Sequence, residues 1–542
     1  MPRFDFLHLF SNLAVEYQEQ REMAKLYPIG VQSFAKLRED GYTYVDKTAF
    51  IENLIKEGNC YFLSRPRRFG KSLLLSTIEA FYRGQKELFE GLAISRMEHD
   101  WQPHPVLHIA LNAYEYNKPE SLLNKFDYDF KVWEQQYGTE MQSASHADRF
   151  RYIIEQAYAK TGQKVVILID EYDKPLLDTA GDKALQDIYR SQLKSIYGNL
   201  KNNDHCIEFA MLTGVSRFGK LSIFSDLNNL LDISLSEEYS AICGMTLEEI
   251  KENFSEGVRE LADRHGITVD DTYGLLKENY DGYHFSPSSP DIYNPFSLLS
   301  ALKTRQIGSY WFSTGTPTFL VDMIRRMEID LRDMENMEDD VDDLMDASFD
   351  LGNTVPIMYQ SGYLTIKDYD ARFNTVTLGY PNREVERGFL NGLMRVFTAG
   401  RNGRTEFDVR KFVLDVEAGR VEDFMIRLQS LFSGYHYDQM DLGNLELHYR
   451  NVIYLTMKLM GFYTEAEMQT ASGRIDLRVK TPEYLYLFEF KVNRSAREAM
   501  DQINDRDYLL PFRADGRKII KVGANFDDAI RSISDWIVEA EG

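Results

Sequence analysis

The sequence has no run of about 18 consecutive apolar residues, so it predicts no membrane span. Its N-terminus lacks the apolar core and the small-residue cleavage site of a signal peptide. Cysteine is scarce, since Cys60, Cys206 and Cys243 are the only three and lie far apart. This spacing fits neither a disulfide framework nor a zinc site. We therefore expect a cytoplasmic protein with buried, reduced thiols and no membrane partner.

Positive charge is also in short supply. The chain has 62 Lys and Arg against 85 Asp and Glu, which gives a net charge of −23 and a pI near 5.0. Because phosphates are attracted to basic surfaces, this balance argues against broad, non-specific nucleic-acid binding, although it is compatible with a local basic groove. Apolar residues are plentiful, at 44% of 542 residues. That length is too great for one core and predicts about two to four domains.

Short apolar runs alternate with longer amphipathic stretches in the first half of the chain. The runs are rich in Val, Ile, Leu and Phe and predict buried strands at residues 59–64, 106–111, 165–169 and 207–212. Residues 71–82 and 184–197 predict helices between them. Buried strands that alternate with helices predict a parallel sheet covered on both faces.

The segment after the first strand has the chemistry of a phosphate-binding loop. Residues 65–72 read Arg-Pro-Arg-Arg-Phe-Gly-Lys-Ser and lead into a predicted helix, whose N-terminus would face the anion. Lys71 supplies a cation for the β- and γ-phosphates, and Ser72 supplies a hydroxyl for magnesium. Arg65 stands where the motif has its first glycine, so the loop is a variant of that motif.

The strand at residues 165–169 delivers two carboxylates, Asp170 and Glu171, at its carboxyl end. We expect Asp170 to organise the magnesium shell and Glu171 to polarise the attacking water as general base. The order and spacing of the two motifs predict a site that binds a nucleoside triphosphate.

Polar residues also follow the strand at residues 207–212. In ATPases with an additional strand, a polar residue at this end senses the γ-phosphate, so Thr213 and Ser216 are candidates for that role. Arg217 is a candidate phosphate contact. The alternative is a turn that merely caps the strand.

Further motifs accompany these residues: Y-P-I-G at 27–30, Y-V-D-K-T at 44–48, I-D-E-Y-D at 169–173, G-V-S-R-F at 214–218 and F-S-D-L-N-N at 224–229. With residues 65–72, they resemble the AAA-ATPase-like family common in bacteria, which tolerates arginine at the first glycine position. The resemblance implies a P-loop domain that binds ATP and Mg²⁺. It implies that the loop residues bind this cofactor: Arg65, Arg67, Arg68, Phe69, Gly70, Lys71 and Ser72.

A second group of charged residues lies near the C-terminus, among predicted strands at 473–479, 484–490 and 518–523. Glu489 and Lys491 are two apart on one strand, so alternation puts them on the same face. Asp476, on the preceding strand, could share a Mg²⁺ or Mn²⁺ ion with Glu489, a water and a phosphate. Lys491 could then orient or deprotonate that water. An edge strand with alternating charges would give the same pattern.

This arrangement resembles the PD-(D/E)xK nuclease superfamily, and specifically the family found fused behind this ATPase, over approximately residues 405–525. The resemblance adds two catalytic positions, Glu446 on an upstream helix and Gln502 on a downstream helix. It implies a restriction-endonuclease-like α/β domain that acts on nucleic acid of unknown type.

The residues between these sites carry less information. Residues 328–350 are crowded with acidic side chains and predict a solvated helix or connector near a domain boundary. Residues 356–366 and 375–379 predict a short helix and a β-hairpin with winged-helix character. DNA binding and a structural lid are equally compatible with this module.

The predicted fold class is α/β: a P-loop ATPase parallel sheet with a helical, winged-helix-like lid, followed by the nuclease-like domain. The predicted domains are the ATPase at 1–240, a helical lid at 241–345, a connecting module at 346–404 and the nuclease-like domain at 405–542. The predicted function is a Mg-ATP-binding ATPase coupled to a metal-dependent nuclease. The alternative is a nucleotide-dependent switch or scaffold with a non-cleaving C-terminal domain and a protein partner. An arginine supplied in trans would require a homo-oligomer.

Overall fold

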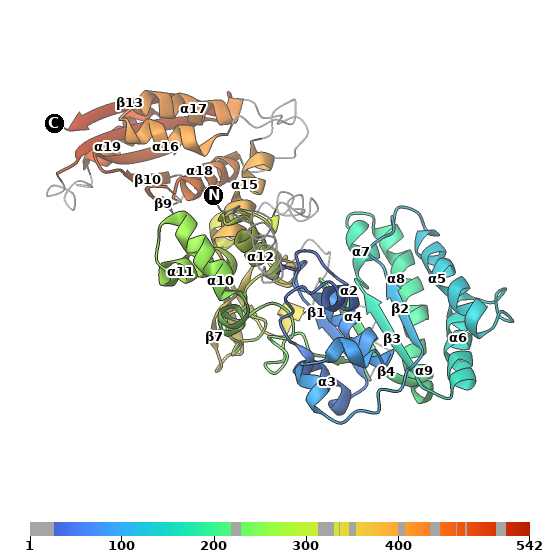
Figure 1. Ribbon diagram of the computed structural model, residues 1–542. Helices are drawn as coiled ribbons and strands as arrows, with labels where there is room; N and C mark the ends of the chain where they lie inside the picture. Colours follow the sequence, from blue (N-terminus) through green and yellow to red (C-terminus); the bar gives the residue numbers. More distant parts are fainter. Residues whose placement is uncertain are drawn as a thin grey trace, which may run out of the picture. The chain divides into compact units, whose positions relative to one another are not determined.

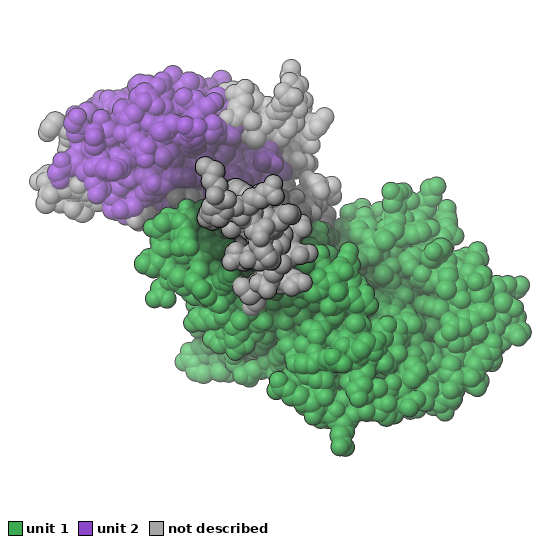
Figure 2. Space-filling model, in the orientation of Figure 1, with its two compact units in different colours: residues 1–311, 338–383 green, residues 312–337, 384–542 purple. Residues whose placement is uncertain are grey.

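The structure, a computed structural model, describes residues 26–217, 229–312, 330–334, 337–345, 354–398, 407–433, 445–461, 463–471, 474–505 and 516–541. The chain forms two compact units (Figure 2). Unit 1 comprises residues 1–311 and 338–383, and unit 2 comprises residues 312–337 and 384–542. Each unit has a five-stranded sheet of its own.

Unit 1 is built on a parallel sheet with the strand order β2-β3-β4-β1-β5. The strands are β1 (Cys60–Ser64), β2 (Val106–Ala110), β3 (Val165–Asp170), β4 (Ile207–Gly214) and β5 (Leu231–Asp232). The four predicted strands are all present, and β1 and β3 are buried along their whole length, as expected for a sheet covered on both faces. β4 lies between β1 and β3. The carboxyl ends of these three strands therefore meet at one edge of the sheet.

Helices flank this sheet (Figure 1). They are α2 (Phe34–Glu39), α3 (Thr48–Glu57), α4 (Lys71–Tyr82), α5 (Ser121–Tyr137), α6 (His146–Thr161), α7 (Lys174–Asp178), α8 (Lys183–Tyr197) and α9 (Asn199–Asn202). α4 spans the predicted residues 71–82 and begins directly after Gly70, whose φ of +99° lies in the left-handed region. A glycine adopts this conformation without steric cost, so the chain can turn from β1 into α4 at this point.

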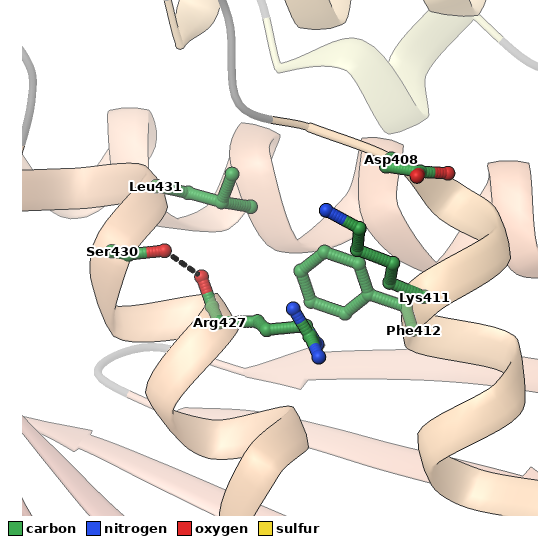
Figure 3. A pocket seen from close by; sticks show the side chains of 6 residues that line it. All are labelled: Asp408, Lys411, Phe412, Arg427, Ser430 and Leu431. Carbon is green, nitrogen blue, oxygen red and sulfur yellow. Dashed lines mark hydrogen bonds between the residues drawn. The ribbon is translucent and has the colours of Figure 1, made fainter.

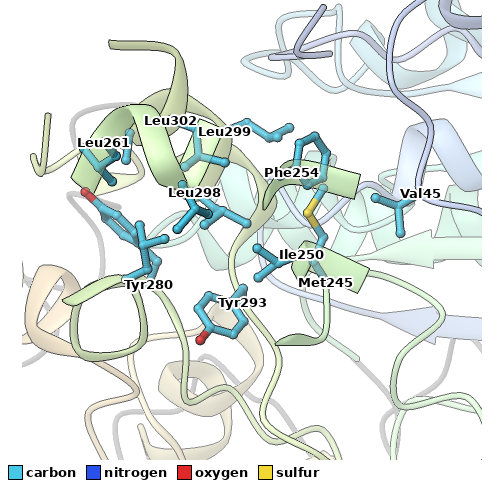
Figure 4. Packing of buried hydrophobic residues seen from close by; sticks show 13 residues of the cluster. Val45, Met245, Ile250, Phe254, Leu261, Tyr280, Tyr293, Leu298, Leu299 and Leu302 are labelled. Carbon is cyan, nitrogen blue, oxygen red and sulfur yellow. The ribbon is translucent and has the colours of Figure 1, made fainter. Parts of the chain in front are cut away.

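A helical subdomain follows the sheet and comprises α10 (Leu247–His265), α11 (Val269–Tyr280) and α12 (Pro295–Thr304). α10 begins with a capping box between Thr246 and Glu249. The apolar faces of the three helices form one core that also includes Val45, from the segment before the P-loop (Figure 4). Lys47 ties the same segment to α10 through its 2.5 Å ion pair with Glu249. This subdomain is called the lid below.

The connecting module contains η6 (Asp343–Met345), α14 (Val355–Ser361) and a sheet of order β6-β8-β7. β7 (Thr365–Asp370) and β8 (Thr375–Gly379) form the predicted antiparallel hairpin. The prediction for the acidic segment was wrong in part, because Met337–Asp340 forms strand β6 rather than a helix or an irregular connector. The backbone of this edge strand forms hydrogen bonds with β8, while the carboxylates of Glu338 and Asp340 are exposed to water.

Unit 2 has a sheet of order β13-β12-β11-β10-β9, in which only the β11–β12 pair is parallel. Its strands are β9 (Glu465–Ala471), β10 (Arg474–Lys480), β11 (Tyr484–Val492), β12 (Lys518–Asp527) and β13 (Ser532–Glu541). Its helices include α15 (Arg383–Phe397), α16 (Val409–Glu417), α17 (Val421–Ser433), α18 (Leu445–Gly461) and α19 (Ala496–Asp505), while the short η5 (Leu331–Met334) packs against α18. The predicted α/β class is thus confirmed for both units.

Two helical layers cover the opposite faces of this second sheet. On one face, Phe424 of α17 packs against Phe488, with ring centroids 5.3 Å apart, and the Tyr486 hydroxyl donates to the carbonyl of Val416 in α16. On the other face, α19 lies against β12 at Gly523. A Cβ at this glycine would come within 2.6 Å of the Met500 amide nitrogen. The glycine therefore allows α19 to approach the strand closely.

Candidate functional sites

The loop between β1 and α4 holds the Lys71 ammonium group in its interior. Lys71 is 5% exposed, and its Nζ donates to the carbonyls of Arg65 and Pro66 at 2.8 and 3.0 Å. Burial lowers the pKa of Lys71, and the nearby carboxylates of Glu171 and Asp170 oppose that shift. A cation held within such a loop is placed to bind a phosphate.

The structure brings Ser72, Asp170 and Thr213 together across three elements. The Ser72 hydroxyl donates to Oδ2 of Asp170 at 2.6 Å, and the Thr213 hydroxyl donates to Oδ1 at 2.7 Å. Asp170 ends β3, Thr213 lies near the end of β4, and Ser72 is in the first turn of α4. Hydroxyl and carboxylate oxygens are the ligands that Mg²⁺ prefers, so this cluster fits the expected ion.

The turn after Asp170 carries a strained residue. Glu171, the predicted general base, has a φ of +54°, which is rare for a residue other than glycine. The next amide, that of Tyr172, donates to the carbonyl of Thr213 at 3.0 Å and so joins the turn to β4. Strain of this kind persists where the surrounding structure fixes the backbone, and it is concentrated at functional sites.

Sequence reasoning missed Asp173, the last residue of the I-D-E-Y-D motif. Its Oδ2 accepts hydrogen bonds from the amides of Val215 and Ser216, at 2.9 and 2.7 Å. Burial raises the pKa of Asp173 to about 6. The carboxylate fastens the end of β4 to the turn after β3. The sequence signal that could have indicated Asp173 is its position three residues after Asp170, in the same acidic motif.

Ser216 and Arg217 are engaged by the protein. The carbonyl of Ser216 accepts the Tyr172 hydroxyl at 2.9 Å, and the Ser216 side chain is buried. Arg217 forms an ion pair with Asp232 at 3.1 Å, and its amide donates to the side chain of Gln360 at 2.6 Å. Of the three candidates at this strand end, Thr213 alone hydrogen-bonds to Asp170. Residues 218–228, which include most of the F-S-D-L-N-N motif, lie outside the described residues.

The loop side chains divide into two sets. Arg67 and Arg68 are exposed, whereas Arg65 and Phe69 are 1% exposed. The Arg65 guanidinium donates to the carbonyls of Ser64, Ser234 and Tyr239 and lies 4.2 Å from the centre of the Phe285 ring. Phe69 packs edge-on against the rings of Tyr283 and Phe285. Arg65 and Phe69 are among the loop residues predicted to bind the cofactor, and their side chains point into the protein and support the loop from behind.

The second candidate site lies on β11. Glu489 and Lys491 are 1% and 6% exposed and form an ion pair of 2.9 Å. The Lys491 ammonium also donates to the side-chain carbonyl of Gln502 in α19. Asp476 lies opposite Glu489 in the register of β10 with β11, while its side chain is outside what the structure describes. Three of the five predicted residues, Glu489, Lys491 and Gln502, are therefore in contact.

Glu446 is placed differently. It lies in the first turn of α18 and pairs at 3.6 Å with Arg450, which contacts Asp330 at 3.2 Å. Within the described part of the chain, no recorded hydrogen bond or ion pair links Glu446 to Lys491. Glu446 therefore belongs to a charged cluster with Arg450 and Asp330.

A cavity of about 380 Å³ lies elsewhere in unit 2, between α16 and α17 (Figure 3). Its walls are formed by Asp408, Lys411, Phe412, Arg427, Ser430 and Leu431. These two helices cover the face of the sheet that carries Tyr486 and Phe488. Because side chains alternate along a strand, Glu489 and Lys491 project from the other face. The cavity is therefore separate from the predicted nuclease site.

Over the described residues, no group of three or more His, Cys, Asp and Glu side chains lies close enough to hold a metal ion. The structure does not describe the side chain of Asp476. None of the described helices combines the length and the apolar character needed to cross a membrane.

The fold and the first site together define a P-loop nucleotide-binding domain, joined to a second α/β unit. Residues 28–224 match the family model described as predicted AAA-ATPase, and residues 444–536 match the PD-(D/E)XK nuclease superfamily. The chain is 35% identical over 538 residues to an uncharacterized protein in the vnfD 5′ region of Azotobacter chroococcum mcd 1. The aligned residues cover 96% of this chain and 99% of that protein. The chain belongs to this family of predicted AAA-ATPases with a C-terminal domain of the PD-(D/E)XK nuclease superfamily.

A solved structure with some likeness is that of the Aeropyrum pernix ORC2 protein in ADPNP and ADP complexes. It shares 14% sequence identity, with coverage of 63% of this chain and 90% of that chain, at a TM-score of 0.23. A TM-score this low carries no argument about the present chain.

Proposed function

We propose that the protein is a Mg-ATP-dependent ATPase whose second unit is a metal-dependent nuclease acting on nucleic acid. The observation that carries the first half is the cluster of Ser72, Asp170 and Thr213 beside the buried ammonium of Lys71. A strand-turn-helix loop, a cation and a magnesium-binding pair of oxygens are the parts that phosphoryl transfer requires.

Each residue has a defined task in this proposal. Ser72 and Asp170 hold Mg²⁺, which neutralises charge on the phosphates when it is bound. Lys71 exchanges its bonds to the loop carbonyls for bonds to the β- and γ-phosphates. Glu171 orients and deprotonates the attacking water. Thr213 fixes the Asp170 carboxylate and contacts the γ-phosphate, and Asp173 holds the strand end on which Thr213 lies.

The nuclease half rests on the contact of Glu489, Lys491 and Gln502 and on the pairing of Asp476 with Glu489. Carboxylates on adjacent strands suit a divalent ion, which would activate water and stabilise charge on the scissile phosphate. Lys491 orients that water, and Gln502 fixes the direction of the ammonium group. Glu446, in the first turn of α18, is the fifth proposed catalytic position.

A second candidate function is a nucleotide-dependent switch with a protein partner and no cleavage. The observation that favours it lies in the second cluster, where the buried ammonium group of Lys491 already has Glu489 and Gln502 as partners. The net charge of −23 favours it as well, because it opposes attraction to nucleic acid.

The two functions separate in one set of assays. ATP binding is measured by calorimetry and turnover by phosphate release, for wild type, Lys71→Ala and Glu171→Gln. Lys71→Ala should abolish binding, and Glu171→Gln should bind ATP but not hydrolyse it. Unchanged binding in Lys71→Ala would contradict the assignment of the loop.

Cleavage is then tested on linear, circular and single-stranded DNA and on RNA, with Mg²⁺ or Mn²⁺ and with or without ATP. Lys491→Ala is compared with Lys521→Ala, a matched control, because Lys521 is an equally buried lysine on the adjacent β12 that pairs with Asn504. Cleavage lost only in Lys491→Ala supports the nuclease. The absence of cleavage of every substrate by a wild type that binds ATP would support the switch.

We further propose a cytoplasmic location, supported by three cysteines that are free and buried. The proposed division of labour follows the predicted segments: ATP chemistry in 1–240, closure by the lid in 241–345, connection in 346–404 and nucleic acid in 405–542. Light scattering with and without ATP would test whether the chain forms a homo-oligomer.

A further inference from the structure

The phosphate-binding loop of this chain contains a strained residue that is not glycine. Residues 65–69 contain no glycine, and Arg68 adopts a φ of +69°. A residue other than glycine in this region pays a steric cost, and such a conformation persists only where neighbouring groups hold it. The loop must therefore be supported by groups outside its own sequence.

That support comes from residues after the ATPase sheet. The indole Nε1 of Trp311 donates to the carbonyl of Arg67 at 3.0 Å, directly before the strained residue. The Arg68 guanidinium lies 5.0 Å from the centre of the Phe296 ring of α12. On the other side, the amide of Gly244 donates to the carbonyl of Phe69 at 3.1 Å. The backbone is thus held immediately before and immediately after Arg68.

Trp311 is itself fixed in place. It is 6% exposed, its amide donates to the hydroxyl of Ser297 in α12 at 3.2 Å, and its ring lies 5.4 Å from that of Tyr363. Next to Tyr363, Gly362 ends α14 so close to the loop that a Cβ there would come within 2.8 Å of Pro66. Lid and connecting module therefore meet at the loop through rigid contacts.

We propose that Trp311 is a positioning residue that holds the phosphate-binding loop from the lid side, so that docking of the lid sets the affinity for ATP. The proposal rests on the proposed function, because it assumes that the loop binds ATP. The indole does not touch the nucleotide. It fixes the peptide between Arg67 and Arg68 and thereby keeps Arg68 in its left-handed conformation.

Trp311→Phe tests this proposal, since it removes the Nε1 donor while keeping an aromatic ring. We expect the Kd for ATP to rise about tenfold, which corresponds to roughly 1.4 kcal/mol, while the midpoint of thermal unfolding changes little. Trp133→Phe is the matched control, because Trp133 lies on α5 and packs against Phe130, away from the loop. Phe296→Leu is the second variant in case Trp311→Phe does not fold, and it should also weaken ATP binding.

A double variant distinguishes a positioning role from general destabilisation. Arg68→Gly removes the strain that Trp311 has to hold, so Trp311→Phe should cost less affinity in the Arg68→Gly background than in wild type. Equal cost in both backgrounds, or ATP binding by Trp311→Phe as tight as by wild type and Trp133→Phe, would overturn the proposal. Failure of the proposed function has a different signature, since wild type and Lys71→Ala would then bind ATP equally.

Discussion

The ion pair between Glu489 and Lys491 gives a quantitative prediction for the stability of unit 2. Lys491→Ala removes the ammonium from a carboxylate that is 1% exposed, and it also removes the donor to Gln502. Breaking a buried pair by deleting one partner costs about 3–5 kcal/mol, because the remaining charge is left in a medium of low dielectric constant. We expect a loss of this size in the free energy of unfolding of unit 2.

The double variant Glu489→Gln/Lys491→Met should cost less than Lys491→Ala alone. Replacing a buried pair with uncharged groups of similar volume avoids the penalty of an isolated charge and is often close to neutral. Urea unfolding gives the free energies of the single and double variants, and hydrogen exchange in β11 and β12 assigns the change to unit 2. ATP binding should be the same in all of them, because the loop belongs to unit 1.

A loss below about 1 kcal/mol for Lys491→Ala, with additive effects in the double variant, would refute this reasoning. It would mean that the carboxylate finds water or another cation once the lysine is gone. The result also sets the conditions for the cleavage assay. If the expected loss is found, Lys491→Ala must be assayed well below its unfolding midpoint, so that missing activity reports on chemistry rather than on unfolding.

Two further predictions concern other buried positions. Burial raises the pKa of Asp281 from 3.8 to about 7, so between these values the folded chain holds a proton that the unfolded chain has released, and stability falls as the pH rises. Asp281→Asn should therefore stabilise unit 1 above about pH 8, by at most about 4 kcal/mol, and it should stabilise unit 1 much less near pH 5. Equal shifts of the urea unfolding midpoint at the two pH values would contradict this prediction. Gly523→Ala should displace α19 and cost about 1–3 kcal/mol, whereas Gly516→Ala, where a Cβ meets no atom within 4 Å, should be near neutral in the same unfolding assay.

The strands that were predictable are those whose burial is visible in the local sequence. Val165–Asp170 and Cys60–Ser64 are continuous apolar runs, because both faces of a parallel strand are covered. β6 and β13 lie at sheet edges and were not predicted. The sequence of β13, S-I-S-D-W-I-V-E-A-E, mixes apolar and charged residues, since part of an edge strand faces water. Its pairing with β12 depends on contacts that no local pattern records.

The motifs of the first candidate site were found for the same reason, because Lys71, Ser72 and Asp170 lie where short segments begin or end. The supporting contacts of Arg65 could not be predicted because its partners are distant in sequence. Its guanidinium reaches the carbonyl of Ser234, 169 positions away, and the indole of Trp311 reaches Arg67 across 244 positions.

Arg65 itself does not adopt a positive φ, and the residue of the loop other than glycine that does is Arg68. The conformation of the loop depends on the carbonyl of Ser234 and the ring of Phe285, which satisfy the buried guanidinium of Arg65, and on Trp311, which donates to the carbonyl of Arg67. Arg65→Gly would leave the carbonyl of Ser234 without this donor and a void beside Phe285, although it restores the usual motif. Arg65 and the residues behind it therefore form one structural unit, and the loop owes its conformation to the second half of unit 1 as much as to its own sequence.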